Sequence, residues 1–214
     1  MSRRPLVISD CDEVLLHMVA PFRVWLGETQ GISFAMTGND LARSMSYAAT
    51  GEPVQTAEMW RLLNQFFETE MTRQYPIAGA LEAMHQLAEV ADVVVLTNLL
   101  DQHRDARTAQ LAGHGLGVKV YTNQGPKGPA LARILAEYSP SRAVFIDDIA
   151  HHIGSAAEVV PHIHRLHLCG EPLLAPHIPC ALAAGHAHAR IDTWDKALPW
   201  LLERIYQDVD FKEA

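Results

Sequence analysis

The chain is 214 residues long, which suits one domain of ordinary size or a core domain with a modest insertion. Hydrophobic residues make up 49% of it and charged residues 20%, as in ordinary globular proteins. A formal net charge of -8 without any cluster of Lys and Arg argues against a nucleic-acid-binding face. No apolar run approaches the roughly 20 residues that span a bilayer, so we expect a cytoplasmic protein without membrane contact.

Short apolar runs alternate with longer segments of helical period along most of the chain. The predicted strands are residues 5–9, 92–97, 118–122, 143–147 and 162–168. The predicted helices between and after them are residues 79–90, 101–115, 128–139, 155–160 and 193–209. This alternation predicts an α/β fold, with a Rossmann-like parallel sheet as its core and helices on both faces.

The stretch from His17 to Tyr75 breaks the alternation, because it holds no convincing strand. It shows helical segments at 19–29, 39–49 and 55–72, and the last has apolar residues at helical spacing. We therefore predict a small helical cap subdomain over residues 16–75, inserted into an α/β core made of residues 1–15 and 76–214. The alternative is that these helices are ordinary parts of one larger core.

Polar side chains gather where the predicted strands end. They are Asp10 and Asp12 after the first strand, Thr97 and Asn98 at the second, Lys127 before a helix, and Asp147 and Asp148 at the fourth strand. Asp, Asn and Thr at a strand end commonly cap a helix or make a turn, so each alone is a weak signal. Together they would lie at the carboxyl edge of a parallel sheet, where such sheets bind ligands. Carboxylate pairs brought together there would repel each other unless a cation such as Mg²⁺ lay between them.

A magnesium ion, a lysine ammonium and a hydroxyl aimed at one point make a receptor for a phosphoryl group. Asp10 is the better candidate nucleophile because it directly follows the strand. Asp12, two residues further on, would serve as acid and then as base. We expect Glu13 to be a solvated turn residue and Cys11 to be a small packing residue, since two flanking aspartates disfavour its thiolate.

The order of these motifs resembles that of the haloacid dehalogenase-like hydrolases of the phosphatase type. The motifs are "DCDEV" near the start, "VVVLTN", the lysine of "GPKGP" and the paired aspartates of "VFIDD". The resemblance spans most of the chain, and it implies that the insertion is a helical cap that closes over the site. One departure is Glu13, where many family phosphatases have glycine. Another is His151 and His152, where a further Asp or Asn often follows the paired aspartates.

The resemblance also implies a role for each site residue. Asp10 would form an aspartyl-phosphate, and Asp12 would be the acid/base that also offers its backbone carbonyl to magnesium. Thr97 and Lys127 would hold the phosphoryl group, with the amide of Asn98 nearby. The metal set would be Asp10, Asp12, Asp147 and Asp148.

We therefore expect a Mg²⁺-dependent phosphohydrolase that acts on a small phosphorylated metabolite. The first alternative is a two-component receiver domain, against which the chain order argues. A receiver has its acidic pair first and its phosphorylated Asp at a later strand end. A 2-haloacid dehalogenase of the same superfamily is a second alternative, against which Asp12 argues because attack at carbon needs no such acid. The third is a catalytically weak binding or regulatory protein on the same fold. A transition-metal site among the C-terminal histidines is disfavoured because His162, His164 and His167 do not share one strand face.

Overall fold

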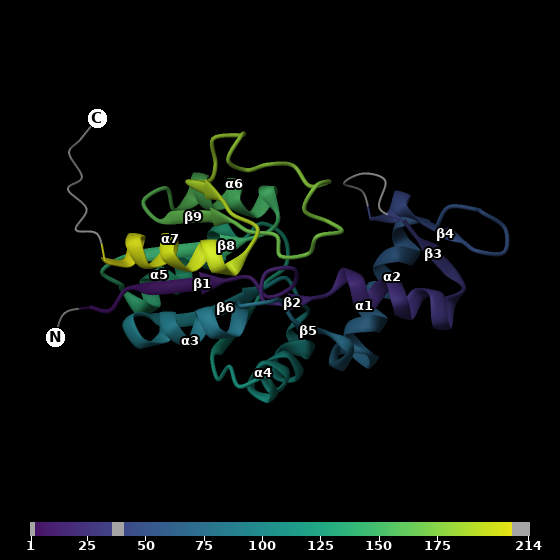
Figure 1. Cartoon of the computed structure of the whole chain (residues 1–214), viewed down its shortest axis with the longest axis horizontal. Helices are drawn as coiled ribbons and strands as arrows, with labels where there is room; N and C mark the ends of the chain where they lie inside the picture. Colours follow the sequence, from purple (N-terminus) through teal and green to yellow (C-terminus); the bar gives the residue numbers. More distant parts are fainter. Residues whose placement is uncertain (1–2, 36–40, 207–214) are drawn as a thin grey trace.

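The computed structural model describes residues 3–35 and 41–206, and a six-stranded parallel sheet lies at its centre (Figure 1). The strand order is β10-β9-β8-β1-β6-β7, and every pairing in this sheet is parallel. The strands are β1 (Leu6–Ser9), β6 (Asp92–Thr97), β7 (Lys119–Thr122), β8 (Ala143–Asp147), β9 (His164–His167) and β10 (Ala189–Arg190). The predicted α/β fold class is confirmed.

Helices cover both faces of the sheet, because successive side chains of each strand point to opposite faces and both sets are apolar. Val7 of β1 joins the apolar cluster under α3 (Ala80–Val90), α4 (Arg104–Gly113) and α7 (Trp194–Tyr206). Its neighbours Leu6 and Ile8 join the cluster under α5 (Gly128–Tyr138) and α6 (Ala150–Val159). A 3-10 turn, η4 (Asp101–His103), precedes α4.

The inserted segment leaves and rejoins the core through two short strands that pair antiparallel, β2 (Leu16–His17) and β5 (Tyr75–Pro76). Between them lie α1 (Val19–Trp25), the π-helical turn η1 (Leu26–Gln30), β3 (Ile32–Phe34), the 3-10 turn η2 (Ala42–Ser44), β4 (Met45–Tyr47), α2 (Thr56–Thr69) and the 3-10 turn η3 (Met71–Arg73). Figure 1 shows this segment beside one end of the core.

The segment is less helical than predicted. α1 and η1 lie where the sequence predicts a helix at 19–29, and α2 lies within the predicted helix at 55–72. The expected helix at 39–49 is wrong, since residues 42–47 form η2 and β4, while residues 36–40 lie outside the described part. The expectation that no strand lies in the insertion also fails. Antiparallel pairing of β3 with β4 buries Ile32 and Phe34 with Ser33 exposed between them, a period-two pattern too short to recognise in sequence.

Aromatic side chains hold the insertion together. Phe66 of α2 lies 5.3 Å from Phe22 and 5.8 Å from Trp25 of α1, measured between ring centroids. The apolar cluster around them also includes Leu99 and Leu174 from the core. The insertion therefore packs on the core as well as on itself, and the boundaries 16 and 75 stay a prediction.

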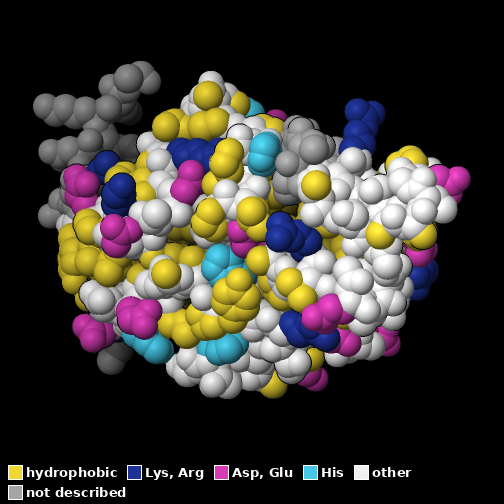
Figure 2. All heavy atoms as spheres, turned by 45° about the vertical axis from the view of Figure 1, so that its right-hand side comes forward, with side chains coloured by type: hydrophobic (Ala, Val, Ile, Leu, Met, Phe, Trp, Pro, Cys, Tyr) yellow, Lys and Arg dark blue, Asp and Glu magenta, His cyan; other side chains and the backbone are white. Residues whose placement is uncertain are grey.

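The surface carries acidic and basic side chains interspersed over the face seen in Figure 2. None of the helices within residues 3–35 and 41–206 combines the length and the apolar character needed to cross a membrane.

Candidate active site

The strand order brings three strand ends together. β1 lies between β8 and β6, so Asp10, which follows β1, is flanked by Asp147 at the end of β8 and Thr97 at the end of β6. The backbone N–H of Asp10 donates a hydrogen bond to the carbonyl of Ile146 at 2.8 Å, which fixes the start of the turn against β8. The strand order therefore brings Asp10, Thr97 and Asp147 together at one edge of the sheet, as the sequence predicts.

A buried group of charges forms at this edge. Asp10, Asp147 and Asp148 are each at most 5% exposed, and their carboxylates offer oxygen atoms within 4.8 Å of one another. Lys127, fully buried just before α5, places Nζ 2.8 Å from Asp10 Oδ2 and 2.6 Å from Asp147 Oδ2. The other oxygen of Asp147 accepts the backbone N–H of Ile149 at 2.8 Å.

The charges in this group do not balance, because three carboxylates face one ammonium. Burial raises the pKa of Asp10 to about 6 against the opposing charge of Lys127. Burial and then the charge of Asp147 raise the pKa of Asp148 well above its ordinary value. Lys127 stays protonated: burial disfavours its charge, but the carboxylates of Asp10 and Asp147 raise its pKa above the usual value. A hard divalent cation with oxygen ligands would relieve the excess, so the residues fit Mg²⁺.

Thr97 and Asn98 lie at the next strand end. Thr97 is fully buried, and its Oγ1 has no hydrogen-bond partner among residues 3–35 and 41–206. Asn98 is exposed, and its amide is already engaged: Nδ2 donates to the carbonyl of Gly125 at 3.0 Å and lies 3.1 Å from Nε2 of His152. Thr97 is therefore free to bind a ligand, whereas Asn98 braces the loop before Lys127.

His152 borders the site, although the sequence marked it only as a departure from the family pattern. It lies on α6, is 6% exposed, and its Nδ1 is buried without a partner in the described residues. Burial lowers its pKa to about 4, and the nearby charge of Lys127 adds to the effect. His152 is therefore a neutral imidazole at neutral pH.

Asp12 lies apart from the other carboxylates and forms a buried ion pair that the sequence did not predict. Its two oxygens accept hydrogen bonds from Nη2 of Arg107 at 2.9 and 3.1 Å, and Oδ1 accepts a third from Nε2 of Gln74 at 2.6 Å. Arg107 is fully buried and Gln74 is 2% exposed. In this structure the side chain of the predicted acid/base is held by α4 and by the residue before β5.

Arg107 also links the core to the insertion. Nη1 donates to Sγ of Cys11 at 2.9 Å, and the guanidinium lies 5.7 Å from the ring centroid of Phe67 on α2. Burial raises the pKa of Cys11 to about 12, which agrees with the prediction that this thiol is no nucleophile. The sequence around Arg107 is typical of a charge on a solvated helix face. Nothing local indicates its partner, because Asp12 lies 95 residues earlier in the chain.

The expectation that Glu13 is a solvated turn residue is wrong, since it is 2% exposed. Its backbone adopts a left-handed conformation with φ of 60°, which glycine adopts more readily than a residue with a side chain. The turn sends the carboxylate back toward the insertion, where Oε1 accepts the backbone N–H groups of Met18 and Val19 at the start of α1. Burial raises the pKa of Glu13 to about 8 in spite of these hydrogen bonds.

Comparison with known proteins finds no matching family model and no matching curated sequence. Solved structures do match. A haloacid dehalogenase-like family protein of Streptococcus pneumoniae is 12% identical, with a TM-score of 0.64 over 94% of this chain and 99% of its own. A candidate β-phosphoglucomutase of Thermotoga maritima is 16% identical, with a TM-score of 0.61 over 95% and 99%.

A third match is a candidate haloacid dehalogenase (HAD)-type hydrolase of Bacillus subtilis, whose structure contains bound magnesium. It is 14% identical, with a TM-score of 0.56 over 94% of this chain and 100% of its own. These identities show a shared fold, and the shared fold extends over nearly the whole of each chain. The protein described here therefore has the fold of the haloacid dehalogenase-like hydrolases, as its motif order predicts.

Proposed function

We propose that the protein is a magnesium-dependent phosphohydrolase that acts on a small phosphorylated metabolite through an aspartyl-phosphate on Asp10. The observation that carries this proposal is the buried group of Asp10, Asp147, Asp148 and Lys127 beside the unpartnered hydroxyl of Thr97. Such a group combines a nucleophile with a cation site and donors for phosphoryl oxygens. The fold supports the proposal, because solved structures with this fold include proteins described as hydrolases and phosphatases.

The metal would be held by Asp10 and Asp148, together with the backbone carbonyl of Asp12. Of the paired aspartates, Asp148 is the more available ligand, because Asp147 already uses one oxygen for Lys127 and the other for a backbone N–H. Magnesium, when bound, neutralises carboxylate charge and polarises phosphoryl oxygens. Lys127 and Thr97 would orient the phosphoryl group.

In the first step a carboxylate oxygen of Asp10 attacks phosphorus, and the bond from phosphorus to the leaving oxygen breaks. The leaving oxygen takes a proton from Asp12. A water molecule then attacks the aspartyl-phosphate, Asp12 takes its proton, and Asp10 is regenerated with release of inorganic phosphate. Because Asp12 is bound to Arg107 and Gln74, its carboxyl group must turn away from them to reach the leaving oxygen. The insertion, as a cap, would exclude water during the first step.

The ion pair between Asp12 and Arg107 favours one other candidate function. A protein that keeps Asp12 bound to Arg107 would capture phosphorylated molecules without hydrolysing them, and would act by binding.

The test is hydrolysis of 4-nitrophenyl phosphate and of a panel of phosphorylated metabolites, with Mg²⁺ and with a chelator. We expect Mg²⁺-dependent phosphate release that is lost in Asp10→Asn, with acid-stable labelling of the wild-type chain by ³²P. Binding of phosphorylated ligands without turnover would support the second function instead. Activity that survives Asp10→Asn would contradict the mechanism, and halide release from a 2-haloacid would indicate the dehalogenase alternative.

A further inference from the structure

A second group of ligand atoms lies outside the active site. Glu13 in the turn after β1, His17 at the end of β2 and Glu171 in the loop after β9 offer nitrogen and oxygen atoms that all lie within 4.8 Å of one another. The two glutamates are 2% and 3% exposed, and the side chain of His17 is 14% exposed. Neither the proposed mechanism nor the motif order assigns a role to this group.

Each glutamate is oriented by backbone groups so that one oxygen is left for another partner. Oε1 of Glu13 accepts the N–H groups of Met18 and Val19, and Oε1 of Glu171 accepts the N–H of Leu173 at 2.8 Å. Oε2 of Glu171 then lies 2.8 Å from Nδ1 of His17. Such bonds to one oxygen hold a carboxylate in place in the way outer-shell partners orient metal ligands.

The remaining oxygen of Glu13 is a second, independent observation that points to a ligand. Oε2 of Glu13 is buried and has no hydrogen-bond partner within the described parts of the chain. Leaving a buried carboxylate oxygen without a partner is costly, and native structures rarely do so. The oxygen belongs to the carboxylate that contributes to the group, so a ligand bound there would satisfy it.

The charge of this group points to a cation. The ion pairs found within residues 3–35 and 41–206 include no Lys or Arg bound to Glu13 or Glu171, and His17 is the one basic partner of Glu171. The imidazole of His17 can balance at most one of the two buried acidic groups, whereas a divalent cation would balance both. One imidazole nitrogen with two carboxylate oxygens is a donor set that suits zinc and related metals, whereas Mg²⁺ prefers oxygen alone.

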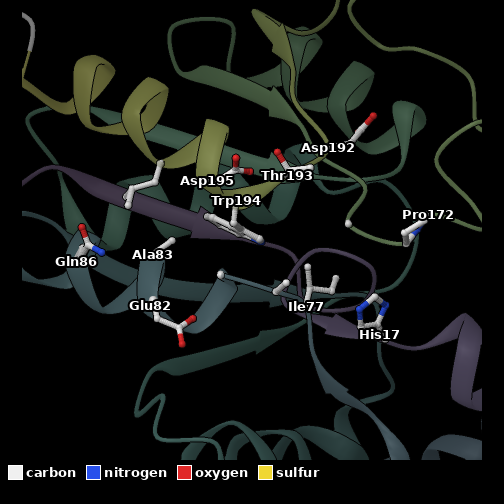
Figure 3. A pocket seen from close by; sticks show the side chains of 14 residues that line it. His17, Ile77, Glu82, Ala83, Gln86, Pro172, Asp192, Thr193, Trp194 and Asp195 are labelled. Atoms are coloured by element: carbon white, nitrogen blue, oxygen red, sulfur yellow. The ribbon is translucent and has the colours of Figure 1, made fainter.

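An ion would have access to this position from a neighbouring pocket. Tetrahedral ligand bonds of about 2.0 to 2.2 Å place neighbouring ligand atoms roughly 3.3 to 3.6 Å apart, so His17 Nδ1 and Glu171 Oε2, which lie 2.8 Å apart, would separate slightly around the ion. His17 lines a pocket of about 610 Å³ together with Gly170 and Pro172. Figure 3 shows the imidazole at one end of this pocket, with Ile77 beside it and Pro172 above it in this view.

We propose that Glu13, His17 and Glu171 bind one divalent transition-metal ion, zinc in preference to manganese, at a site separate from the active-site magnesium. The ion would join β2, through which the chain enters the insertion, to the core loop that carries Glu171. It would therefore fix the insertion relative to the core. The order of affinity follows from the general preference of mixed nitrogen and oxygen sites for Zn²⁺ over Mn²⁺.

The test is calorimetric titration of the full chain with Zn²⁺ in excess Mg²⁺, which occupies the active-site carboxylates. We expect one Zn²⁺ per chain in the wild type and a loss of affinity of more than about 100-fold in His17→Gln and Glu171→Gln, since even outer-shell changes cost about 10- to 100-fold. Glu82→Gln, on the wall of the same pocket but outside the group, is the matched control and should bind as wild type. Asp148→Asn should also keep the zinc.

Three further measurements separate binding from folding. Circular dichroism identifies any variant that fails to fold, and the absorption spectrum of bound Co²⁺ should change in His17→Gln because a nitrogen ligand is lost. At about 100-fold excess over its dissociation constant, Zn²⁺ should raise the melting temperature of the wild type by about 5 to 10 °C. Absence of stoichiometric Zn²⁺ binding, unchanged binding in folded His17→Gln, or loss of zinc in Asp148→Asn would each overturn the proposal. None of these readouts depends on phosphatase activity.

Discussion

Replacing Arg107 with methionine removes the guanidinium that holds Asp12. Arg107 is fully buried and donates to both oxygens of Asp12 and to Cys11. Removing one partner of a buried ion pair typically costs about 3 to 5 kcal/mol. Asp12 is 17% exposed at its side chain and keeps its bond from Gln74, so we expect the lower limit, about 3 kcal/mol. For a chain of this size that corresponds to a fall of about 6 to 12 °C in melting temperature.

The assay is urea unfolding followed by tryptophan fluorescence, with Arg104→Met as the matched control. Arg104 lies on the same helix, but its ion pair with Asp101 is at the surface, where the two side chains are 47% and 80% exposed. Exposed pairs contribute at most about 1 kcal/mol, so this control should unfold nearly as the wild type does. If Arg107→Met were no less stable than Arg104→Met, the ion pair would not stabilise the fold and the reasoning would be refuted.

A double variant isolates the interaction itself. Arg107→Met combined with Asp12→Asn leaves no unpaired charge, so its loss of stability should be smaller than the sum of the two single losses by about 1 to 3 kcal/mol. Simple additivity of the two losses would mean that the cost of Arg107→Met arises from packing against Phe67 rather than from the charge pair.

Three other variants test the site. Lys127→Met leaves buried carboxylates uncompensated and should lower the free energy of unfolding by about 3 kcal/mol or more in urea titrations, while phosphate release falls below detection. Thr97→Val removes an unpartnered buried hydroxyl, so stability should hold or rise, whereas kcat/KM should drop about 10- to 100-fold if the hydroxyl binds the phosphoryl group. His152, with a pKa of about 4 in the fold, takes up its proton more readily when unfolded, so stability should fall as pH drops from about 6.5 to 4. His152→Gln should flatten that slope.

The fold was predictable because its central strands carry a signal of their own. β1, β6 and β8 are buried on both faces, and their near-continuous apolar residues distinguish them from amphipathic helices. The chain places Asp10, Thr97 and Asp147 at the ends of these strands, so a correct strand assignment also brings the side chains together. β3 and β4 have three residues each, and a pattern of that length competes poorly with the helical pattern around it.

The role of Arg107 was not predictable for a different reason. A charged residue on a helix is usually solvated, and its local pattern is the same whether the helix face meets water or a buried acid. What buries Arg107 is the position of α4 against the turn after β1 and against Phe67, which depends on contacts between distant parts of the chain. A sequence pattern limited to one helix contains none of that information.

In the turn after β1, the carboxylates of Asp10, Asp12 and Glu13 bind three different parts of the molecule. Asp10 pairs with Lys127 in the core, and Asp12 binds Gln74, next to the strand by which the insertion returns. Glu13 binds the first backbone N–H groups of α1 inside the insertion, so both connections to the insertion are bonded to residues within three positions of the candidate nucleophile. A rotation of the insertion about β2 and β5 would strain or break these bonds before it affected the sheet. A movement of the insertion would therefore act on Asp12 through Gln74, while Arg107 holds Asp12 from the core.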